Sequence, residues 1–110
     1  MKLPNAELAI VDERKVREYL LSDSHPIGRF KAAFFRKVGF KPDNWRDLRA
    51  QLLEIAVSND AELGAKTEFG QKYPIDGILR GTGGLSGQVT TVWIILRGQD
   101  IPRLVTVYPR

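Results

Sequence analysis

Two β-rich runs near the C-terminal end constrain the fold of this chain more than any other feature of its sequence. Residues 90–97 (TTVWIILR) and 102–109 (PRLVTVYP) consist largely of β-branched, aliphatic and aromatic side chains, and only residues 98–101 (GQDI) separate them. Two runs of this composition around so short a loop are typical of a β-hairpin. The end of the chain is therefore expected to form two paired antiparallel strands.

The expected register gives this hairpin two unlike faces. With residue 97 opposite residue 102, alternation along each strand assigns every side chain to one face or the other. One face is apolar and is expected to cover the core: Val92, Ile94, Val105 and Val107. The other carries hydroxyl groups and rings: Thr91, Trp93, Thr106 and Tyr108, with Ile95 and Leu104 nearer the loop. We expect this second face to be a ligand-binding surface.

The first 60 residues show helical periodicity, and the remainder shows strand-like patterns. Apolar stripes at helical spacing are expected to face the core, and they comprise Val16, Tyr19 and Leu20 in one segment and Trp45, Leu48, Leu52 and Ile55 in another. Helices are expected to begin at Asp12, which can cap free amides, near Pro26, which suits a first turn, and at a cap formed by Asp43. Strands are expected at residues 63–69, 71–79, 88–97 and 103–108, with residues 6–10 as a candidate for one more. The sequence thus predicts an α+β fold in which about three N-terminal helices pack on a four-stranded antiparallel sheet.

Chain length and charge set bounds on organisation and partners. At 110 residues we expect a single domain over residues 1–110, with a helical half at 1–60 and a sheet half at 61–110. Lysine and arginine number 17 against 13 aspartate and glutamate, which gives a net charge of +4 and a pI near 9.6. This balance favours anionic partners such as nucleic acid. It argues against an antitoxin or immunity role, for which an acidic surface is expected.

Missing residue types and motifs exclude several kinds of chemistry. The chain has no cysteine, so disulfides, thiolate metal sites and cysteine catalysis are excluded. Residues 81–84 (GTGG) lack the Gly-Lys-Ser or Gly-Lys-Thr ending of a phosphate-binding loop. The carboxylates are best explained as helix caps and solvated faces, and no serine lies in a nucleophile elbow. We therefore expect neither a metal nor another cofactor.

No feature of the sequence indicates a membrane partner. No apolar run approaches the roughly 20 residues that a membrane helix needs, and residues 1–5 (MKLPN) do not resemble the apolar core of an export signal. We therefore expect a cytoplasmic site of action.

The single histidine is the natural candidate for a general base. Imidazole exchanges protons near neutral pH, and His25 shares the segment 25–31 (HPIGRFK) with Lys31. A base and cations are enough to cleave RNA without a metal, because the 2′-hydroxyl of the substrate is itself the nucleophile. The groups available for this chemistry are His25, Lys31, Arg80, Thr91, Arg97, Thr106 and Tyr108, and Trp93 or Tyr108 can stack on an unpaired base.

Each of these residues also has a purely structural interpretation. His25 fits a surface or helix-capping position, Lys31 can extend its stem along apolar surface toward solvent, and Trp93 can be part of the core. A second acid or base is not identified from the sequence, so either Tyr108 or Lys31 protonates the leaving group, or the leaving group departs largely unassisted.

Five segments resemble an uncharacterised bacterial domain family of about this length, which has no assigned function. They are residues 3–6 (LPNA), 25–35 (HPxGRxKxxFF), 70–73 (GxKY), 91–94 (TVWI) and 102–109 (PRLVTxYP). More loosely, the layout is similar to the barnase–EndoU–colicin–RelE superfamily of metal-independent ribonuclease toxins, in which helices precede a twisted antiparallel sheet.

The looser resemblance implies a role for particular residues. It implies site residues at His25 and Lys31 from the helical half and at Thr91, Thr106 and Tyr108 from the last two strands. It also implies that Arg97 or Arg103 binds phosphate, and that an acidic antitoxin or immunity protein masks the basic face.

Two functions therefore follow as hypotheses. The first is a metal-independent endoribonuclease toxin of a bacterial toxin–antitoxin or toxin–immunity pair, with His25, Lys31, Thr91 and Tyr108 as catalytic residues. Its substrate-binding residues are Arg80, Trp93, Arg97, Arg103 and Thr106. The second is a non-catalytic module that uses the same basic and aromatic face to bind RNA or a protein partner.

Overall fold

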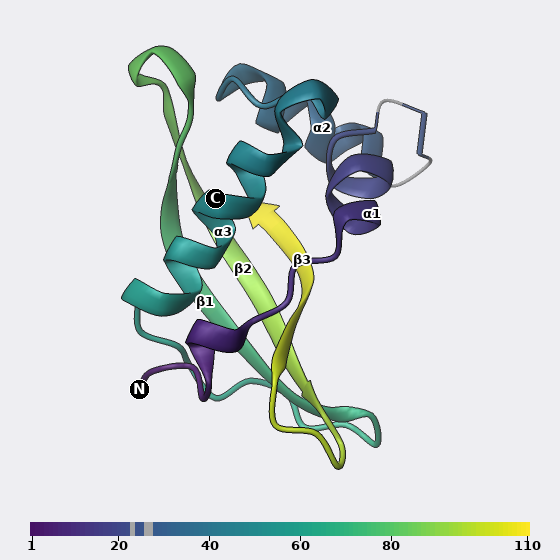
Figure 1. The fold of residues 1–110 in the computed structure, drawn as a ribbon, viewed down its shortest axis with the longest axis vertical. Coiled ribbons are helices and arrows are strands. Elements are labelled where there is room, and N and C mark those ends of the chain that lie inside the picture. The colour runs from purple at the N-terminus through teal and green to yellow at the C-terminus, as the bar shows by residue number, and fades with distance from the viewer. Residues whose placement is uncertain (23, 26–27) are drawn as a thin grey trace.

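The computed structural model describes residues 1–22, 24–25 and 28–110. Apart from a short 3-10 turn between β1 and β2, its helical elements precede an antiparallel sheet whose strands lie in the order β1-β2-β3 (Figure 1). In chain order the elements are η1 (Ala6–Leu8), α1 (Glu13–Lys15), η2 (Val16–Leu20), α2 (Gly28–Lys37), η3 (Pro42–Asn44), α3 (Trp45–Ser58), β1 (Gly70–Arg80), η4 (Thr82–Gly84), β2 (Ser86–Leu96) and β3 (Pro102–Pro109). The fold is α+β with its helices N-terminal, as expected.

The expectation of a fourth strand at residues 63–69 is wrong, because within the described residues the sheet has three strands. The segment does follow β1: the amide of Gly64 donates to the Lys72 carbonyl, and the amide of Lys72 donates to the Ala65 carbonyl. Two residues of the segment thus oppose one of β1, which interrupts a regular ladder. Pro74 of β1 accepts a bond from the Glu62 amide but has no N–H to return.

Two further expectations for the helical half are also corrected. Residues 6–10 do not form a strand: Ala6–Leu8 is a short 3-10 helix, and only Ile10 bridges to Arg103 at the edge of β3. The residue that precedes α3 is Asn44, so Asp43 does not cap that helix. The cap at Asp12 is confirmed, since its side chain accepts the Arg14 amide at 2.8 Å. Pro26 lies outside the described residues.

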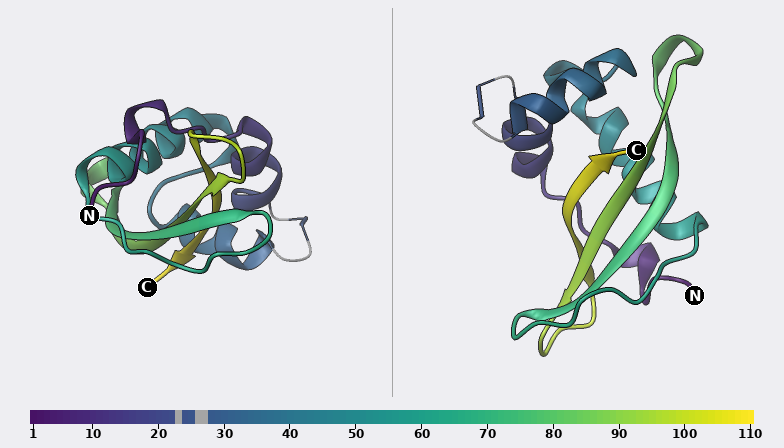
Figure 2. Two further views of the ribbon diagram at one scale, coloured as in Figure 1. Left: turned by 90° about the horizontal axis from the view of Figure 1, so that it is seen from below. Right: turned by 180° about the vertical axis from the view of Figure 1, so that it is seen from behind.

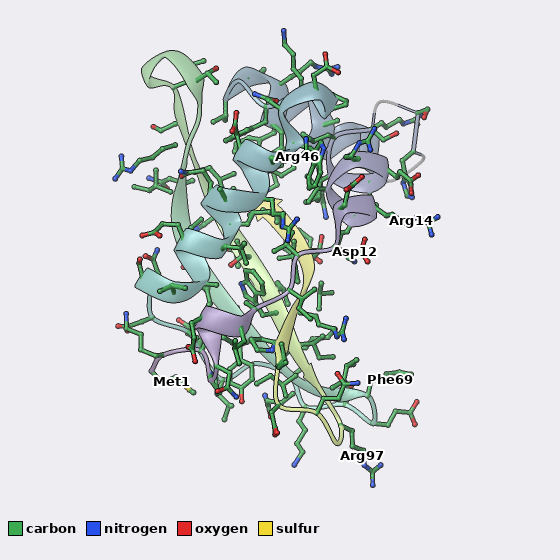
Figure 3. The ribbon with its side chains drawn as sticks, in the orientation of Figure 1. Met1, Asp12, Arg14, Arg46, Phe69 and Arg97 are labelled. Carbon is green, nitrogen blue, oxygen red and sulfur yellow. The ribbon has the colours of Figure 1, made fainter. Side chains whose placement is uncertain are left out.

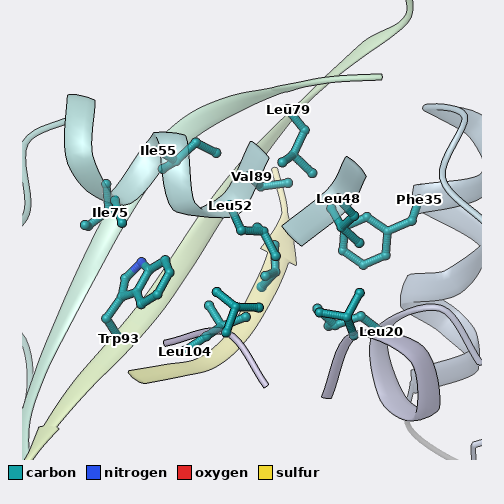
Figure 4. Close-up of a cluster of buried hydrophobic side chains, with 14 of the residues drawn as sticks. Leu20, Phe35, Leu48, Leu52, Ile55, Ile75, Leu79, Val89, Trp93 and Leu104 are labelled. Atoms are coloured by element: carbon teal, nitrogen blue, oxygen red, sulfur yellow. The ribbon is translucent and has the colours of Figure 1, made fainter. Parts of the chain in front are cut away.

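The core lies between α3 and one face of the sheet. Leu48, Leu52 and Ile55 of α3 are buried, and Figure 4 shows them with side chains of all three strands. The helix packs closely on β1, because a Cβ at Gly77 would meet the Ile55 side chain at 2.8 Å. In the view from behind, the strands lie in front of α3, and no described helix covers their other face (Figure 2, right).

A β-bulge in β3 overturns the expected faces of the hairpin. The expected register, with residue 97 opposite residue 102, is also wrong, because Pro102 pairs with Ile95 and Leu104 with Trp93. Val92 then pairs with Thr106, so that Val105 is an extra residue. A single extra residue moves every later side chain to the other face.

Independently of the bulge, β2 presents to the core the side that was expected to face outward. Thr91 and Trp93 face the core, whereas Val92 and Ile94, which were expected in the core, are only half-buried on the outer face. Val107 does lie in the core, as expected, since the bulge turns it inward.

The two core-facing polar side chains of β2, Thr91 and Trp93, have hydrogen-bond partners in the core. The Trp93 indole N–H donates to Thr91 Oγ1 at 2.8 Å, and Thr91 Oγ1 donates to the Ile75 carbonyl at 2.9 Å. All polar side-chain atoms that are buried among the described residues have hydrogen-bond partners.

We expect Thr91→Val to lower the free energy of unfolding by about 1–3 kcal/mol, because it leaves the buried indole N–H without an acceptor. Chemical denaturation monitored by tryptophan fluorescence measures this change. Thr90→Val is the matched control, since Thr90 bonds the exposed Asp76 carboxylate instead. Equal stability loss in the two variants would contradict the expectation.

No helix in the described part of the chain is both long enough and apolar enough to cross a bilayer.

Candidate functional site

The bulge in β3 turns Thr106 and Tyr108 away from α3 and toward the edge of the sheet where α2 lies. The Lys31 side chain, from α2, reaches this edge: its Nζ donates to Thr106 Oγ1 at 2.7 Å. The same ammonium lies 4.4 Å from the centre of the Tyr108 ring, a cation–π contact. The structure therefore brings together Lys31 from the helical half with Thr106 and Tyr108 from the sheet half, three residues that the sequence analysis selected.

Tyr19 joins these residues from η2. Lys31 Nζ donates to its phenolic oxygen at 3.2 Å and also lies 5.2 Å from its ring centre. His25 in turn packs edge-to-face on the Tyr19 ring, with the ring centres 4.9 Å apart. We refer to these five residues as the Lys31 cluster: Tyr19, His25, Lys31, Thr106 and Tyr108.

The surroundings of Tyr19 change its acidity. Partial burial acts to raise the pKa of the phenol, but hydrogen bonds with Lys31 and Thr106 and the charges of Lys31 and Lys15 outweigh it. The pKa of Tyr19 consequently lies below the ordinary tyrosine value. A phenol of this kind transfers a proton more readily than an ordinary tyrosine.

The cluster borders open space on its Tyr19 and His25 side. A hollow of ≈ 480 Å³ is lined there by Asp12, Arg14, Lys15, Glu18, Tyr19 and His25. The Glu18 carboxylate is paired with Arg14 at 3.0 Å, which offsets its charge. The imidazole and the phenol are therefore within reach of a ligand from solvent.

Lys15 binds the bulge that orients Thr106 and Tyr108, the two residues of the cluster that lie on β3. Its Nζ donates to the carbonyl of Val105, the extra residue, at 2.8 Å. The same side chain lines the hollow and contributes to the lowered pKa of Tyr19. Lys15 thus connects the helical segment to the strand at the point that decides where Thr106 faces.

The other sequence-predicted site residues lie elsewhere. Thr91 and Trp93 are fully buried in the core and face away from the Lys31 cluster, which contradicts their expected contact with substrate. Arg80 lies at the end of β1 beside α3, where its amide bonds Gln51. Arg97 is at the tip of the β2–β3 hairpin, at the end of the molecule remote from α2 (Figure 3). Arg103 is exposed on β3, opposite Ile94.

Sequence reasoning missed Tyr19 and Lys15 as site residues. Tyr19 was assigned to the apolar stripe of the first helix with Val16 and Leu20, and both of these are indeed fully buried. The helix, however, continues as a π-helical turn, closed by the bond from the Leu21 amide to the Val16 carbonyl. Such turns often occur at functional sites, but nothing in the local sequence predicts one here.

Among the described residues, no three histidine, aspartate or glutamate side chains gather as a possible metal-ligand set.

Comparison with protein families assigns the chain to one of them. A family described as "Domain of unknown function (DUF6883)" matches residues 2–110. The chain belongs to this family. The match extends over the five segments on which the resemblance to an uncharacterised domain family was based. No curated protein matches the sequence.

A solved structure shares the fold. It is a chain of the "Contact-dependent growth inhibition toxin - immunity protein complex from Klebsiella pneumoniae 342". The TM-score is 0.70 at 17% sequence identity, and the match covers 92% of this DUF6883 chain and 99% of the other. The fold of the DUF6883 chain is therefore also found in that toxin–immunity complex.

Proposed function

We propose that residues 1–110 form the single catalytic domain of a metal-independent endoribonuclease toxin, which acts in the cytoplasm of a bacterial cell and is neutralised by an acidic immunity protein or antitoxin. The observation that carries this proposal is the chain of contacts from His25 through Tyr19 to Lys31. It places a possible base, a phenol with a lowered pKa and an ammonium in one cluster beside an open hollow.

The division of roles follows from the chemistry of each group. His25 takes the proton of the 2′-hydroxyl, whose oxygen forms a bond to phosphorus while the bond from phosphorus to the 5′-oxygen breaks. Tyr19 gives its proton to the departing 5′-oxygen, which supplies the second acid that the sequence analysis did not identify. Lys31 stabilises the charge on the phosphorane, and Thr106 holds Lys31 in place. The products are a 2′,3′-cyclic phosphate and a 5′-hydroxyl.

Charge supports the toxin rather than the immunity protein. The shared fold comes from a complex that contains both a toxin and an immunity protein. The net charge of +4 suits a protein that binds RNA, and it suits an acidic partner. An immunity protein that masks a basic nuclease is expected to carry the opposite charge.

The test is to incubate purified protein with total RNA in the presence of a chelator and to analyse the fragment ends. We expect fragments with 2′,3′-cyclic phosphates, and we expect His25→Ala to reduce the cleavage rate by about 10²–10⁴-fold, as for loss of a general base. Lys37→Ala, on the same helix but exposed, is the control and should retain activity. Intact RNA with the wild-type protein would refute the proposal, and RNA that is bound but uncut would favour the binding module.

A further inference from the structure

The strand register places the outer side chains of the sheet in three cross-strand rows, on the face that α3 does not cover. The rows are Asp76–Thr90–Tyr108, Pro74–Val92–Thr106 and Lys72–Ile94–Arg103. The bond from Thr90 Oγ1 to Asp76 Oδ1 at 2.6 Å confirms that paired residues share this face. We call these nine residues the open sheet face.

Thr106 is buried where Lys31 contacts it, but the rest of the open sheet face is partly or fully exposed, and this face is not uniformly polar. The middle-strand residues Val92 and Ile94 are half-buried. In the view from behind, no described helix lies over the middle of the sheet on this face (Figure 2, right). Val92 and Ile94 both belong to the middle of their rows, so an apolar strip runs along β2. An aliphatic surface of this kind can support a ribose or a base, while charged residues at its sides hold the phosphates.

The Lys31 cluster lies at one end of this strip. Thr106 and Tyr108 are both members of the rows, and the Lys31 ammonium contacts each of them from the edge of β3. A phosphate held by Lys31 would therefore lie beside the first two rows. The third row is two residues farther along β2, roughly 7 Å at the usual rise of a strand, a step that one extended nucleotide can span.

The third row carries two cations that nothing on the described chain neutralises. Lys72 and Arg103 flank Ile94 on either side, and neither has a carboxylate within ion-pairing distance among the described residues. The strands that bear them are two interstrand spacings apart, roughly 10 Å, so both long side chains can close on a single phosphate. In the first row, by contrast, the Asp76 carboxylate disfavours a phosphate, although Arg110 lies 3.5 Å from it.

We propose that Lys72 and Arg103 form a second phosphate-binding site, which holds the phosphate next to the one that is cleaved, with the intervening nucleoside lying over Val92 and Ile94. The inference rests on the proposed ribonuclease function for the cleaved phosphate. It predicts that RNA runs along the sheet from the Lys31 cluster toward the β2–β3 hairpin. It also predicts that an efficient substrate extends at least one phosphate beyond the cleaved bond.

Two assays test this site, with Lys72→Gln/Arg103→Gln as the variant. The matched control is Lys41→Gln/Arg49→Gln, which also removes one lysine and one arginine charge. Both positions are exposed and lie away from the open sheet face, Lys41 just before η3 and Arg49 in α3. In the first assay, kcat/KM is measured on a dinucleoside monophosphate and on trinucleotides that carry one additional phosphate. We expect the variant to lose at least tenfold on one trinucleotide and to match the wild type on the dinucleoside, while the control matches on both.

The second assay does not depend on cleavage. Binding of a 2′-deoxy oligonucleotide, which has no 2′-hydroxyl, is measured by fluorescence anisotropy at several salt concentrations. We expect the slope of log K against log salt to be smaller in magnitude by about 0.7 in the variant, as for loss of one phosphate contact on a single strand.

The outcomes separate the two proposals. Binding with the expected change in slope but no cleavage supports the phosphate site and refutes the nuclease. Cleavage with equal losses on the dinucleoside and the trinucleotides, or an unchanged slope, overturns the phosphate site. No binding by the wild type overturns it as well. Melting temperatures of both double variants check that the sheet is intact.

Discussion

Lys31→Met is expected to reduce RNA cleavage by about 10²–10³-fold, the usual effect of removing a group that stabilises transition-state charge. The ammonium is the centre of the cluster, since it donates to Thr106 and Tyr19 and lies against the Tyr108 ring. Methionine keeps most of the apolar stem and removes only the charge and the donors. Single-turnover cleavage of a labelled oligonucleotide measures the effect.

The same variant is expected to raise the pKa of Tyr19 toward its ordinary value, because Lys31 provides both a hydrogen bond and a charge that lower it. Titration of the Tyr19 ¹³Cζ resonance in wild type and variant measures this directly. As the proposed acid, Tyr19 is active while protonated, so cleavage by the wild type is expected to fall as pH rises through the lowered pKa. In Lys31→Met the residual activity is expected to persist to higher pH.

A contribution to stability accompanies this shift. The folded state lowers the pKa of Tyr19, so the stabilisation is complete above the pKa of the unfolded chain, near 10. It is lost as pH falls through the lowered pKa of the folded protein. Lys37→Met, on an exposed position of α2, is the control for both measurements. An unchanged Tyr19 titration in Lys31→Met would contradict the contact, and unchanged cleavage would contradict the assigned role.

Trp93→Ala is expected to lower the free energy of unfolding by about 3–5 kcal/mol, the usual cost of truncating a large core aromatic residue. Trp93 is fully buried and packs among residues of α3 and the sheet (Figure 4). The loss is a large part of the roughly 5–15 kcal/mol that a typical domain has in total, so the variant is expected to unfold far more easily. Urea denaturation followed by circular dichroism measures it.

Phe69→Ala is the control for this prediction, since the Phe69 side chain is 66% exposed and its truncation should have little effect. The stability of Trp93→Ala also distinguishes two roles for this residue. In the structure Trp93 is part of the core, whereas one interpretation of the sequence has it stack on RNA. A Trp93→Ala protein that kept its stability and lost RNA binding would restore that interpretation.

The helical half illustrates what periodicity can and cannot predict. The stripe of Trp45, Leu48, Leu52 and Ile55 is buried as expected, because one face of a helix repeats at the spacing that the sequence shows. The cap at Asp12 is likewise local and was predicted correctly. The π-helical turn of η2 was not, since its winding depends on packing against the rest of the fold.

The sheet half shows the same division. Its strands β1, β2 and β3 agree closely with three of the expected runs, because β-branched and aromatic composition is a local property. The fourth run, residues 63–69, does not form a strand. Its pairing with β1 is irregular, because Gly64 and Ala65 both oppose Lys72 and because Pro74 of β1 has no N–H to donate. Whether a run pairs regularly depends on a partner strand, and that is a tertiary property.

The candidate site was partly predictable for similar reasons. His25 and Lys31 were selected for their chemistry, and Thr106 and Tyr108 for their place on the last strand; the structure links all four through Tyr19 and Lys31. Thr91 was selected with them because regular alternation put it on their face. The bulge at Val105 separates it from them.

By itself, the sequence determined that helices precede an antiparallel sheet, where the three strands of that sheet lie, the basic charge and the residue types that are available for metal-free chemistry. Only the tertiary structure decided which side chains meet. In a strand, the face on which a side chain lies depends only on whether its position is odd or even. One extra residue at Val105 therefore moves every later side chain of β3 to the other face. The carbonyl of that residue is bound by Lys15, 90 positions earlier in the chain. A contact over this separation exists only after the helices have packed on the sheet edge, which is why no local pattern encodes it.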